Sequence, residues 1–386
     1  MSKTFLYADN NGSSQLLPEV KDYLLSRLTS GPFANPSSIH SLGQSISLGL
    51  SKCRKIIADA IKCDTEQIIF TSCASESISQ IFHSVLTSSS KKIILSSQIE
   101  HAATVEALKY YEQLGFKIAY INTKRDGTVD LEHYKSLLEL HNSNIALVCV
   151  IAANNETGVI QPYKSIGALA HDNDLLFFSD TTQVIAKLDF SFEDSNIDFA
   201  VASSHKMGAL VGSGLLLTKE VYLLKSIIFG GGQEKHKRGG TENYIAIETM
   251  ALSLQIFDQN KIALDSCEVL KEKFEKNILK SYPQVTIIGE SAPRLACTSL
   301  LSFPGIHGQA VQIELEAHNI FVTTSSACGD NEPETSHVLK AMGCSDTVGR
   351  GVIRLSFSAN MTSDQFQTLE IALINIYKKL DLIKGY

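Results

Sequence analysis

The stretch "IDFAVASSHKMGALVGSGLLLT", residues 197–218, places two apolar runs on either side of a polar Ser-Ser-His-Lys segment. Each run is short, rich in β-forming residues and bounded by polar residues or glycine, which indicates a buried strand. The lysine between them, Lys206, therefore follows directly on a predicted strand. A lysine in this place is either a solvated edge residue or a covalent anchor, and the rest of the sequence has to decide.

The same pattern extends over the first two thirds of the chain. Apolar runs predict strands at 67–72, 91–97, 117–122, 145–153, 175–180, 197–203 and 212–218. Between them, helical patterns lie near 41–61, 75–87, 101–114, 130–140 and 164–173. Continuous apolar strands that alternate with helices predict an α/β layer whose sheet is mostly parallel and buried on both faces.

After about residue 260 the pattern changes. A long helical pattern covers 261–280, and short strand-like pieces follow at 285–289, 298–303, 319–325 and 352–358. An amphipathic helix is predicted over 362–382. We therefore expect a large α/β domain over 15–260 and a smaller α+β domain made of 1–14 and 261–386.

Composition and charge exclude several classes of function. The chain has 386 residues and a formal net charge of −7, from 34 Lys and Arg against 41 Asp and Glu, so we expect no nucleic-acid binding. No apolar run is long enough to span a membrane, and the first ten residues lack the features of a signal peptide. We therefore predict a soluble, cytoplasmic protein that does not bind membranes.

The cysteines and histidines do not form a metal-binding pattern. The 8 cysteines include no C-x-x-C pair, which argues against a zinc ribbon or a thioredoxin-like site. In a cytosolic protein of this size we expect free thiols. No pair of histidines or carboxylates has the spacing that a helical zinc site needs, so no metal is predicted.

Polar residues follow five of the predicted strands. They are Ser72-Cys73-Ala74-Ser75, Glu100-His101, Asn154-Asn155-Glu156, Ser179-Asp180 and Ser203-Ser204-His205-Lys206. In an open parallel sheet, ligands bind at the carboxyl ends of the strands, so these residues together outline a site.

The residues at the strand ends suit pyridoxal phosphate. The sequence has no dinucleotide fingerprint, P-loop or G-x-S-x-G elbow. Pyridoxal phosphate needs a lysine for its Schiff base and a carboxylate that keeps the ring nitrogen protonated, which Lys206 and Asp180 can supply. Its phosphate needs an anion site, and residues 71–77, which leave a strand and open a helix, can form one.

These residues resemble the class V aminotransferase-like, fold-type I pyridoxal phosphate enzymes, and closely the cysteine desulfurases of the nitrogen-fixation and iron–sulfur-assembly kind. Ten segments carry the resemblance, in order and over nearly the whole chain: "YADNNGSS" (7–14), "NPSSIHSLG" (35–43), "IIFTSCASES" (68–77), "EHAA" (100–103), "NNETGVIQP" (154–162), "SDTTQVIAK" (179–187), "SSHKMG" (203–208), "GGGQEKHKRGGTEN" (230–243), "SSAC" (325–328) and "IRLSFS" (353–358). The resemblance implies a large domain with a mostly parallel seven-stranded sheet, and a smaller α+β domain that carries the "SSAC" loop.

The resemblance also implies roles for the groups around the cofactor ring. Lys206 would form the Schiff base and later move the Cα and C4′ protons. His101 would stack on the ring and take part in proton transfer, which suits a flat group that titrates near neutrality. Asp180 would pair with the ring nitrogen, and Gln183 would donate a hydrogen bond to the phenolic oxygen.

The remaining ligands hold the phosphate and the substrate. By resemblance, the phosphate would be bound by the Ala74 N–H, Ser75, Ser203, His205 and, from a second subunit, Thr241, which implies a homodimer. Asn155 would contact both cofactor and substrate, and Arg354 would clamp the α-carboxylate in a bidentate fork.

Cys328 is the residue that distinguishes a desulfurase from other enzymes of this type. It lies in a polar, Gly- and Pro-containing stretch that indicates an exposed loop. Its thiolate would take the sulfur of L-cysteine as a persulfide, leave L-alanine, and pass the sulfur to an acceptor such as an iron–sulfur scaffold protein.

Two other functions stay open on the sequence. One is a selenocysteine lyase or another aminotransferase-like lyase, in which Cys328 would be dispensable. The other is a non-catalytic protein of sulfur relay or assembly. The sequence also departs from the usual family pattern: Cys73 stands in place of glycine, Leu210-Val211 in place of Pro-Lys, and Gly329-Asp330 in place of Thr-Ser.

Overall fold

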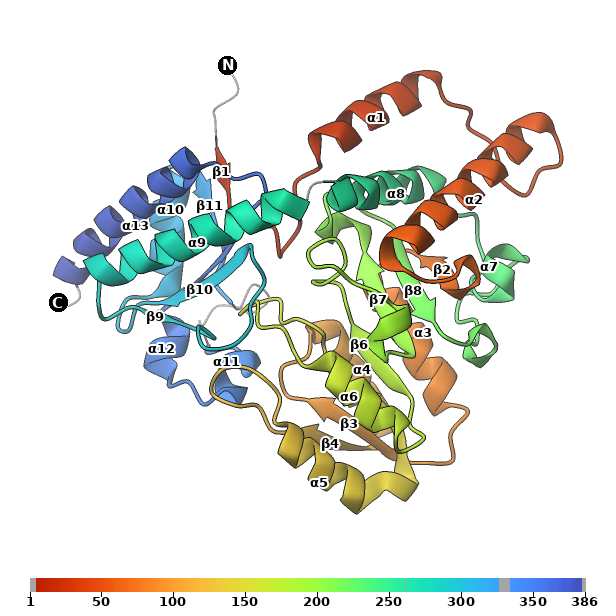
Figure 1. Cartoon of the computed structure of the whole chain (residues 1–386), viewed down its shortest axis with the longest axis horizontal. Helices are drawn as coiled ribbons and strands as arrows, with labels where there is room; N and C mark the ends of the chain where they lie inside the picture. Colours follow the sequence, from red (N-terminus) through yellow and green to blue (C-terminus); the bar gives the residue numbers. More distant parts are fainter. Residues whose placement is uncertain (1–4, 260, 326–333, 384–386) are drawn as a thin grey trace.

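A computed structural model of the chain describes residues 5–259, 261–325 and 334–383. Its largest element is a sheet of seven strands, shown in Figure 1, and the seven strands predicted in the first two thirds of the chain all belong to it. Their order across the sheet is β2 (Ile68–Thr71), β8 (Gly214–Thr218), β7 (Phe199–Ser203), β6 (Phe177–Asp180), β5 (Ile145–Cys149), β3 (Ile93–Ser97) and β4 (Lys117–Ile121). Only β8 runs antiparallel to its two neighbours, so the predicted mostly parallel sheet is confirmed.

Helices cover both faces of this sheet, which explains the continuous apolar runs. One face is covered by α3 (Ala74–Leu86) and α4 (Ala102–Gln113), and the other by α2 (Ser41–Ile61), α5 (Leu131–His141), α6 (Tyr163–His171) and α8 (Tyr244–Gln259). Phe177 and Phe178 are consecutive in β6 and pack into opposite layers, and neither has any exposed surface. A strand buried on both faces has no polar side, so it shows no alternation in the sequence.

A second group of elements lies beside the large sheet (Figure 1). It contains an antiparallel sheet in the order β12 (Val352–Ser356), β10 (Thr298–Ser302), β9 (Thr286–Ile287), and the parallel pair β1 (Leu6–Tyr7) and β11 (Ile320–Phe321). The helices α9 (Lys261–Ser281), α10 (Gly308–Ala317) and α13 (Ser363–Ile383) pack on these strands around a separate hydrophobic cluster. The predicted α+β character is present, while the boundaries given above for the two domains stay a prediction.

Several helices were not predicted from the sequence. They are α1 (Pro18–Ser30), α7 (Gln233–His236), α8, α10, α11 (His337–Ala341) and α12 (Asp346–Arg350). α8 packs against α2 and the large sheet and is mostly apolar, and such a buried helix lacks the amphipathic period that identifies a surface helix.

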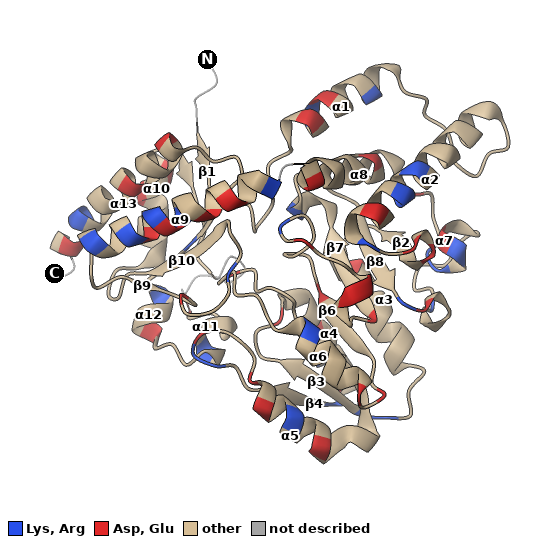
Figure 2. Ribbon diagram, in the orientation of Figure 1, with Lys and Arg blue, Asp and Glu red and all other residues tan. Residues whose placement is uncertain are grey.

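Charges of both signs are mixed over the outer helices. Figure 2 shows lysine and arginine interspersed with aspartate and glutamate on α5 and α9. These helices therefore present ordinary solvated faces. Within the described residues, no helix has the length and the apolar composition that a membrane span requires.

Candidate active site

Lys206 lies at the carboxyl end of β7, in the short 3₁₀ turn Ser204–Lys206 that the strand leads into. Its Nζ donates hydrogen bonds to the backbone oxygen of Asn11 at 2.8 Å and to that of Gly12. Burial, and then the positive charge of Arg354, lower the pKa of Lys206 to about 8. The lysine is therefore a partly buried amine held toward the N-terminal segment, which does not fit a solvated edge residue.

Asp180 and His101 lie near this lysine, at the ends of two other strands. Asp180 ends β6, is buried, and accepts a hydrogen bond from the Thr182 N–H at 2.9 Å. His101 caps α4, and its Nδ1 accepts a hydrogen bond from the Ala103 N–H at 3.2 Å. Burial lowers the pKa of His101, and Asp180 and Lys206 act on that pKa with opposite signs. The three predicted ring-binding residues are therefore close enough for the charges of Asp180 and Lys206 to act on His101.

The predicted phosphate site is at the N-terminus of α3. Ser203 Oγ accepts a hydrogen bond from the Ala74 N–H at 2.7 Å, which joins the end of β7 to the first turn of α3. Ser75, the next residue, is exposed. His205 Nδ1 lies 3.2 Å from Ser13 Oγ, and burial together with nearby lysine charges lowers the pKa of His205 to about 4. A helix N-terminus beside a hydroxyl and a neutral imidazole can bind an anion.

Arg354 reaches the site from the small antiparallel sheet. It lies on β12, is buried, and forms an ion pair with Asp9, with 2.6 Å between Nη2 and Oδ1. Its Nη1 donates to the backbone oxygen of Asn155 at 3.1 Å, whereas its Nε, also buried, has no partner among the described residues. The guanidinium therefore keeps a free donor near the predicted substrate position.

Gln183 belongs to a hydrogen-bonded group whose other members, Lys187 and Asn11, had no role in the sequence prediction. Lys187 Nζ donates to Gln183 Oε1 and, at 2.9 Å, to Asn11 Oδ1. Gln183 Nε2 in turn donates to the backbone oxygen of Asn11 at 3.1 Å. Desolvation, followed by the charge of Lys206, lowers the pKa of Lys187 to about 7. The spacing of four residues between Gln183 and Lys187 is the signal that could have found this pair.

Two buried carboxyl groups lie around the site, Glu100 beside His101 and Glu156 near Arg354. Glu100 Oε1 accepts hydrogen bonds from the Ser97 hydroxyl and, at 2.9 Å, from the Ile151 N–H. Burial raises the pKa of Glu100 to about 8 and that of Glu156 to about 7. His337 Nε2 lies 2.9 Å from the backbone oxygen of Glu100, so α11 is tied to the residue that precedes His101.

The structure thus brings together most of the predicted site. The members of this cluster are Lys206, Asp180, His101, Gln183, Ala74, Ser203, His205, Asn155 and Arg354. Ser75 lies at its rim, and Thr241 is exposed between α7 and α8, with no hydrogen bond to the cluster in the described part of the chain. Cys328 lies outside the described residues.

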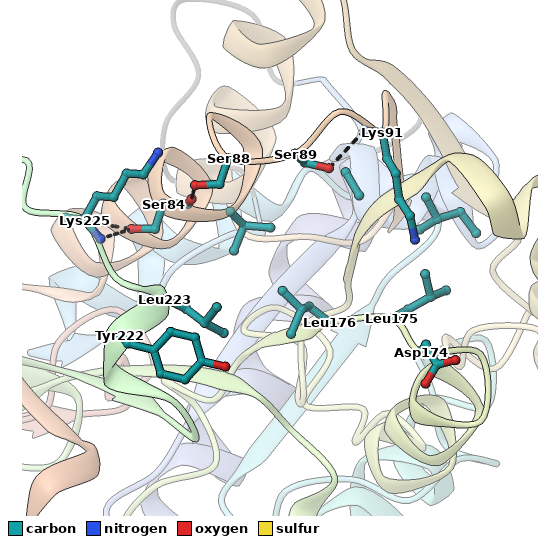
Figure 3. A pocket seen from close by; sticks show the side chains of 13 residues that line it. Ser84, Ser88, Ser89, Lys91, Asp174, Leu175, Leu176, Tyr222, Leu223 and Lys225 are labelled. Atoms are coloured by element: carbon teal, nitrogen blue, oxygen red, sulfur yellow. Dashed lines mark hydrogen bonds between the residues drawn. The ribbon is translucent and has the colours of Figure 1, made fainter.

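A surface groove of about 380 Å³ lies elsewhere on the molecule. Figure 3 shows its wall of Ser84, Lys91, Asp174, Tyr222 and Lys225. It adjoins Ile145, the first residue of β5, and Leu175 and Leu176, which precede β6. The groove is therefore at the amino ends of the strands, whereas the predicted site residues meet at the carboxyl ends.

Comparison with known proteins gives a consistent family. Residues 6–369 match the family model "Aminotransferase class-V". "Cysteine desulfurase 2" of Trichormus variabilis is 30% identical over 382 residues, which cover 99% of this chain and 95% of that protein. The solved NifS-like protein of Rickettsia africae superposes with a TM-score of 0.87 at 31% identity, over 97% of this chain and 100% of that chain. SspA, solved in complex with cysteine, superposes with a TM-score of 0.79 at 27% identity, over 93% of this chain and 100% of that chain. This chain therefore belongs to the class-V aminotransferase family, on its cysteine desulfurase branch.

Proposed function

We propose that this protein is a pyridoxal phosphate-dependent L-cysteine desulfurase. It takes the sulfur of L-cysteine as a persulfide on Cys328, releases L-alanine, and passes the sulfur to an acceptor protein. One observation carries the proposal. Lys206, Asp180 and His101 meet at the carboxyl ends of the strands of the large sheet, and β12 of the small antiparallel sheet brings Arg354 beside them.

The described residues fit pyridoxal phosphate. Asp180 is a buried carboxylate suited to a protonated ring nitrogen, and the neighbouring Thr182 has a buried hydroxyl without a partner among the described residues. The N-terminus of α3, together with Ser203 and His205, suits the phosphate. When bound, the cofactor supplies the electron sink that makes the Cα proton of the substrate acidic.

The lysine and the histidine are both suited to move protons. With a pKa of about 8, about a tenth of Lys206 is neutral at pH 7, far more than for an ordinary lysine, and the neutral amine can take up a proton from Cα. Because burial lowers the pKa of His101, its imidazole is also neutral there; its Nδ1 accepts from the Ala103 N–H, so the hydrogen is on Nε2, which can donate to the reacting groups. Arg354 holds the substrate carboxylate and so fixes which Cα bond faces these groups.

The sulfur step is assigned to Cys328. Its thiolate forms a bond to the sulfur of the substrate while the bond between that sulfur and the substrate carbon breaks. The products are one enzyme persulfide and one L-alanine, so the step needs no outside oxidant.

The proposed enzyme is a homodimer, in which Thr241 of one subunit completes the phosphate site of the other. The segment that carries Thr241 supports this arrangement. The Gly239 N–H donates to the Ile228 backbone oxygen at 2.8 Å, which places Thr241 close to Phe229, an aromatic side chain that is 86% exposed. An exposed phenylalanine beside an exposed ligand residue suits a subunit contact.

The test is turnover of L-cysteine by purified protein in the presence of a reductant. Sulfide and alanine should form in equal amounts, and the protein should be yellow. Lys206→Ala should lose both activity and colour, whereas Cys328→Ser should lose activity and keep the colour. Full activity of Cys328→Ser on L-cysteine would overturn the persulfide step, and turnover restricted to L-selenocysteine would identify a selenocysteine lyase instead.

A further inference from the structure

Two thiols that the proposed reaction does not use meet beside the active site. Cys267 lies in α9, and Cys297 immediately precedes β10. Their sulfur atoms are 3.0 Å apart, and one hydrogen bond joins the two thiols. The pair therefore links the long helix of the second group of elements to the start of its central strand.

One of the two sulfur atoms can be reached from a cavity. Cys297 lines a cavity of about 250 Å³, whose wall also includes Lys206, Lys187 and Asn11. Cys267 does not line it and is fully buried. A small molecule in the cavity would therefore meet Cys297 first, with Cys267 behind it.

The charges around the pair make its two members unequal. The hydrogen bond that Cys297 shares with Cys267, followed by the positive charges of Lys187 and Lys271, lowers the pKa of Cys297 against the opposing effects of burial and Glu268. The same hydrogen bond and burial raise the pKa of Cys267. Lys271 is held in place by a hydrogen bond from its Nζ to the Leu295 backbone oxygen at 3.1 Å. Cys297 is thus the thiol of the pair that ionises more readily, and Cys267 the one that stays protonated.

The five other described cysteines lack this combination. The neighbour of the Cys73 sulfur is the Ser72 hydroxyl, at 3.7 Å, and not a second thiol. Burial raises the pKa of Cys53, Cys63, Cys149 and Cys344. None of these four has a second thiol within hydrogen-bonding distance among the described residues. These four are single thiols that stay protonated, whereas Cys297 and Cys267 form a pair of adjacent thiols.

We propose that Cys297 and Cys267 form a redox-active dithiol site, which small peroxides oxidise to an intramolecular disulfide. The Cys297 thiolate attacks one oxygen of hydrogen peroxide, and the O–O bond breaks. With one proton taken up, this gives a sulfenic acid on Cys297 and one water. The Cys267 sulfur then attacks the sulfenic sulfur, the S–O bond breaks, and the Cys267 proton leaves with the hydroxyl as a second water. Two thiols are oxidised, and one peroxide is reduced to two waters.

Oxidation changes the surroundings of the active-site lysines. The Cys297 thiolate is a negative neighbour that raises the pKa of Lys187, and a disulfide removes that charge. The disulfide also fixes α9 to the residue that precedes Thr298, whose hydroxyl accepts a hydrogen bond from Asn11 Nδ2 at 3.0 Å. Asn11 in turn holds both Lys206 and Lys187, so the dithiol site is connected to the catalytic lysine.

The experiment uses the holoenzyme, treated with hydrogen peroxide, alkylated and digested for mass spectrometry. We expect a cross-linked pair of peptides that contain Cys267 and Cys297, two hydrogens lighter than their sum and separated by dithiothreitol. Cys267→Ser should instead accumulate higher oxides of Cys297, and Cys344→Ser, the matched control, should behave as the unaltered protein.

Three results would overturn the proposal. In the first, peroxide has oxidised Cys328, yet Cys267 and Cys297 are both recovered as alkylated thiols. In the second, a disulfide joins Cys297 to a different cysteine. The third is stepwise oxidation of Cys297 beyond the sulfenic acid in the unaltered protein. Because the peptide map of the unaltered protein decides each of them, a failure of Cys267→Ser to fold does not affect the test.

Discussion

Arg354 Nη2 lies 2.6 Å from Asp9 Oδ1, so the guanidinium that we expect to bind the substrate carboxylate is already paired with a carboxylate of the chain. The pairing is between β12 and the N-terminal segment, two parts of the chain that are distant in the sequence. A second bond, to the Asn155 backbone oxygen, fixes the plane of the guanidinium. Arg354 is therefore ordered before substrate arrives, which lowers the entropy cost of binding.

Arg354→Lys should weaken the binding of L-cysteine while the cofactor stays in place. A lysine keeps the charge but cannot form the planar bidentate contact with a carboxylate. Loss of one charged hydrogen bond costs about 1.5–3 kcal/mol, so KM for L-cysteine should rise by roughly 10- to 100-fold. Steady-state kinetics measures this, with the absorbance of the bound cofactor as the control. An unchanged KM would show that Arg354 has no part in substrate binding.

The rate at which the apoprotein takes up pyridoxal phosphate should depend on pH through Lys206. The neutral amine is the form that reacts with an aldehyde, and a lowered pKa means that this form appears at lower pH than for an ordinary lysine. Because the pKa of Lys206 is lowered to about 8, the rate should rise about tenfold per pH unit below 8 and level off above it. Stopped-flow absorbance at several pH values measures the profile. A midpoint near that of a free lysine would contradict the assigned environment.

The sequence predicts the large sheet well, because its strands are buried on both faces. Each of the seven apolar runs became a strand, and the ends of five of them marked a functional segment. Burial has the opposite effect on the prediction of helix α8. A helix buried on most sides has no polar period to identify it, so α8 was missed. Local pattern therefore identifies buried strands and clearly amphipathic helices, but it misses an enclosed helix such as α8 and also a mostly exposed helix such as α1.

The sequence predicts those site residues whose own chemistry and position identify them. Lys206, Asp180 and His101 follow strands and have reactive groups, so they could be found by position. Asn11 could not, because its role depends on contacts with Lys206 and Lys187, which lie 195 and 176 residues away in the sequence. Such contacts between distant segments arise only when the two sheets come together.

Lys187→Met should weaken cofactor binding, because it removes the donor that fixes the amide of Gln183. With Oε1 held by Lys187, the Nε2 donor faces the opposite way, and without Lys187 the amide is held only by its bond to the Asn11 backbone oxygen. The loss of one charged hydrogen bond predicts about a tenfold or larger rise in the dissociation constant of pyridoxal phosphate. Absorbance titration of the apoprotein measures it.

The matched control for this change is Lys55→Met. Lys55 is exposed on α2, where it pairs with Asp59 four residues later, and a surface pair of this kind contributes little to stability. The control should bind the cofactor as the unaltered protein does. Equal dissociation constants for the two variants would show that Lys187 does not position Gln183.

Gly214→Ala should disturb the predicted phosphate site through β8, the strand that begins at Gly214. Gly214 lies opposite Thr71 and Ser203 in the sheet, and a Cβ built on it would lie 2.6 Å from the backbone carbonyl carbon of Cys73. The clash is with backbone, so either β8 or the N-terminus of α3 has to move, at a cost of about 1–3 kcal/mol. We expect a lower free energy of unfolding in urea and weaker binding of pyridoxal phosphate. Gly49→Ala is the control, because its Cβ would meet only the Glu248 carboxylate, at an ordinary contact distance of 3.9 Å. If Gly214→Ala were as stable and bound cofactor as tightly as this control, then the close approach of β8 to the phosphate turn would not govern the site.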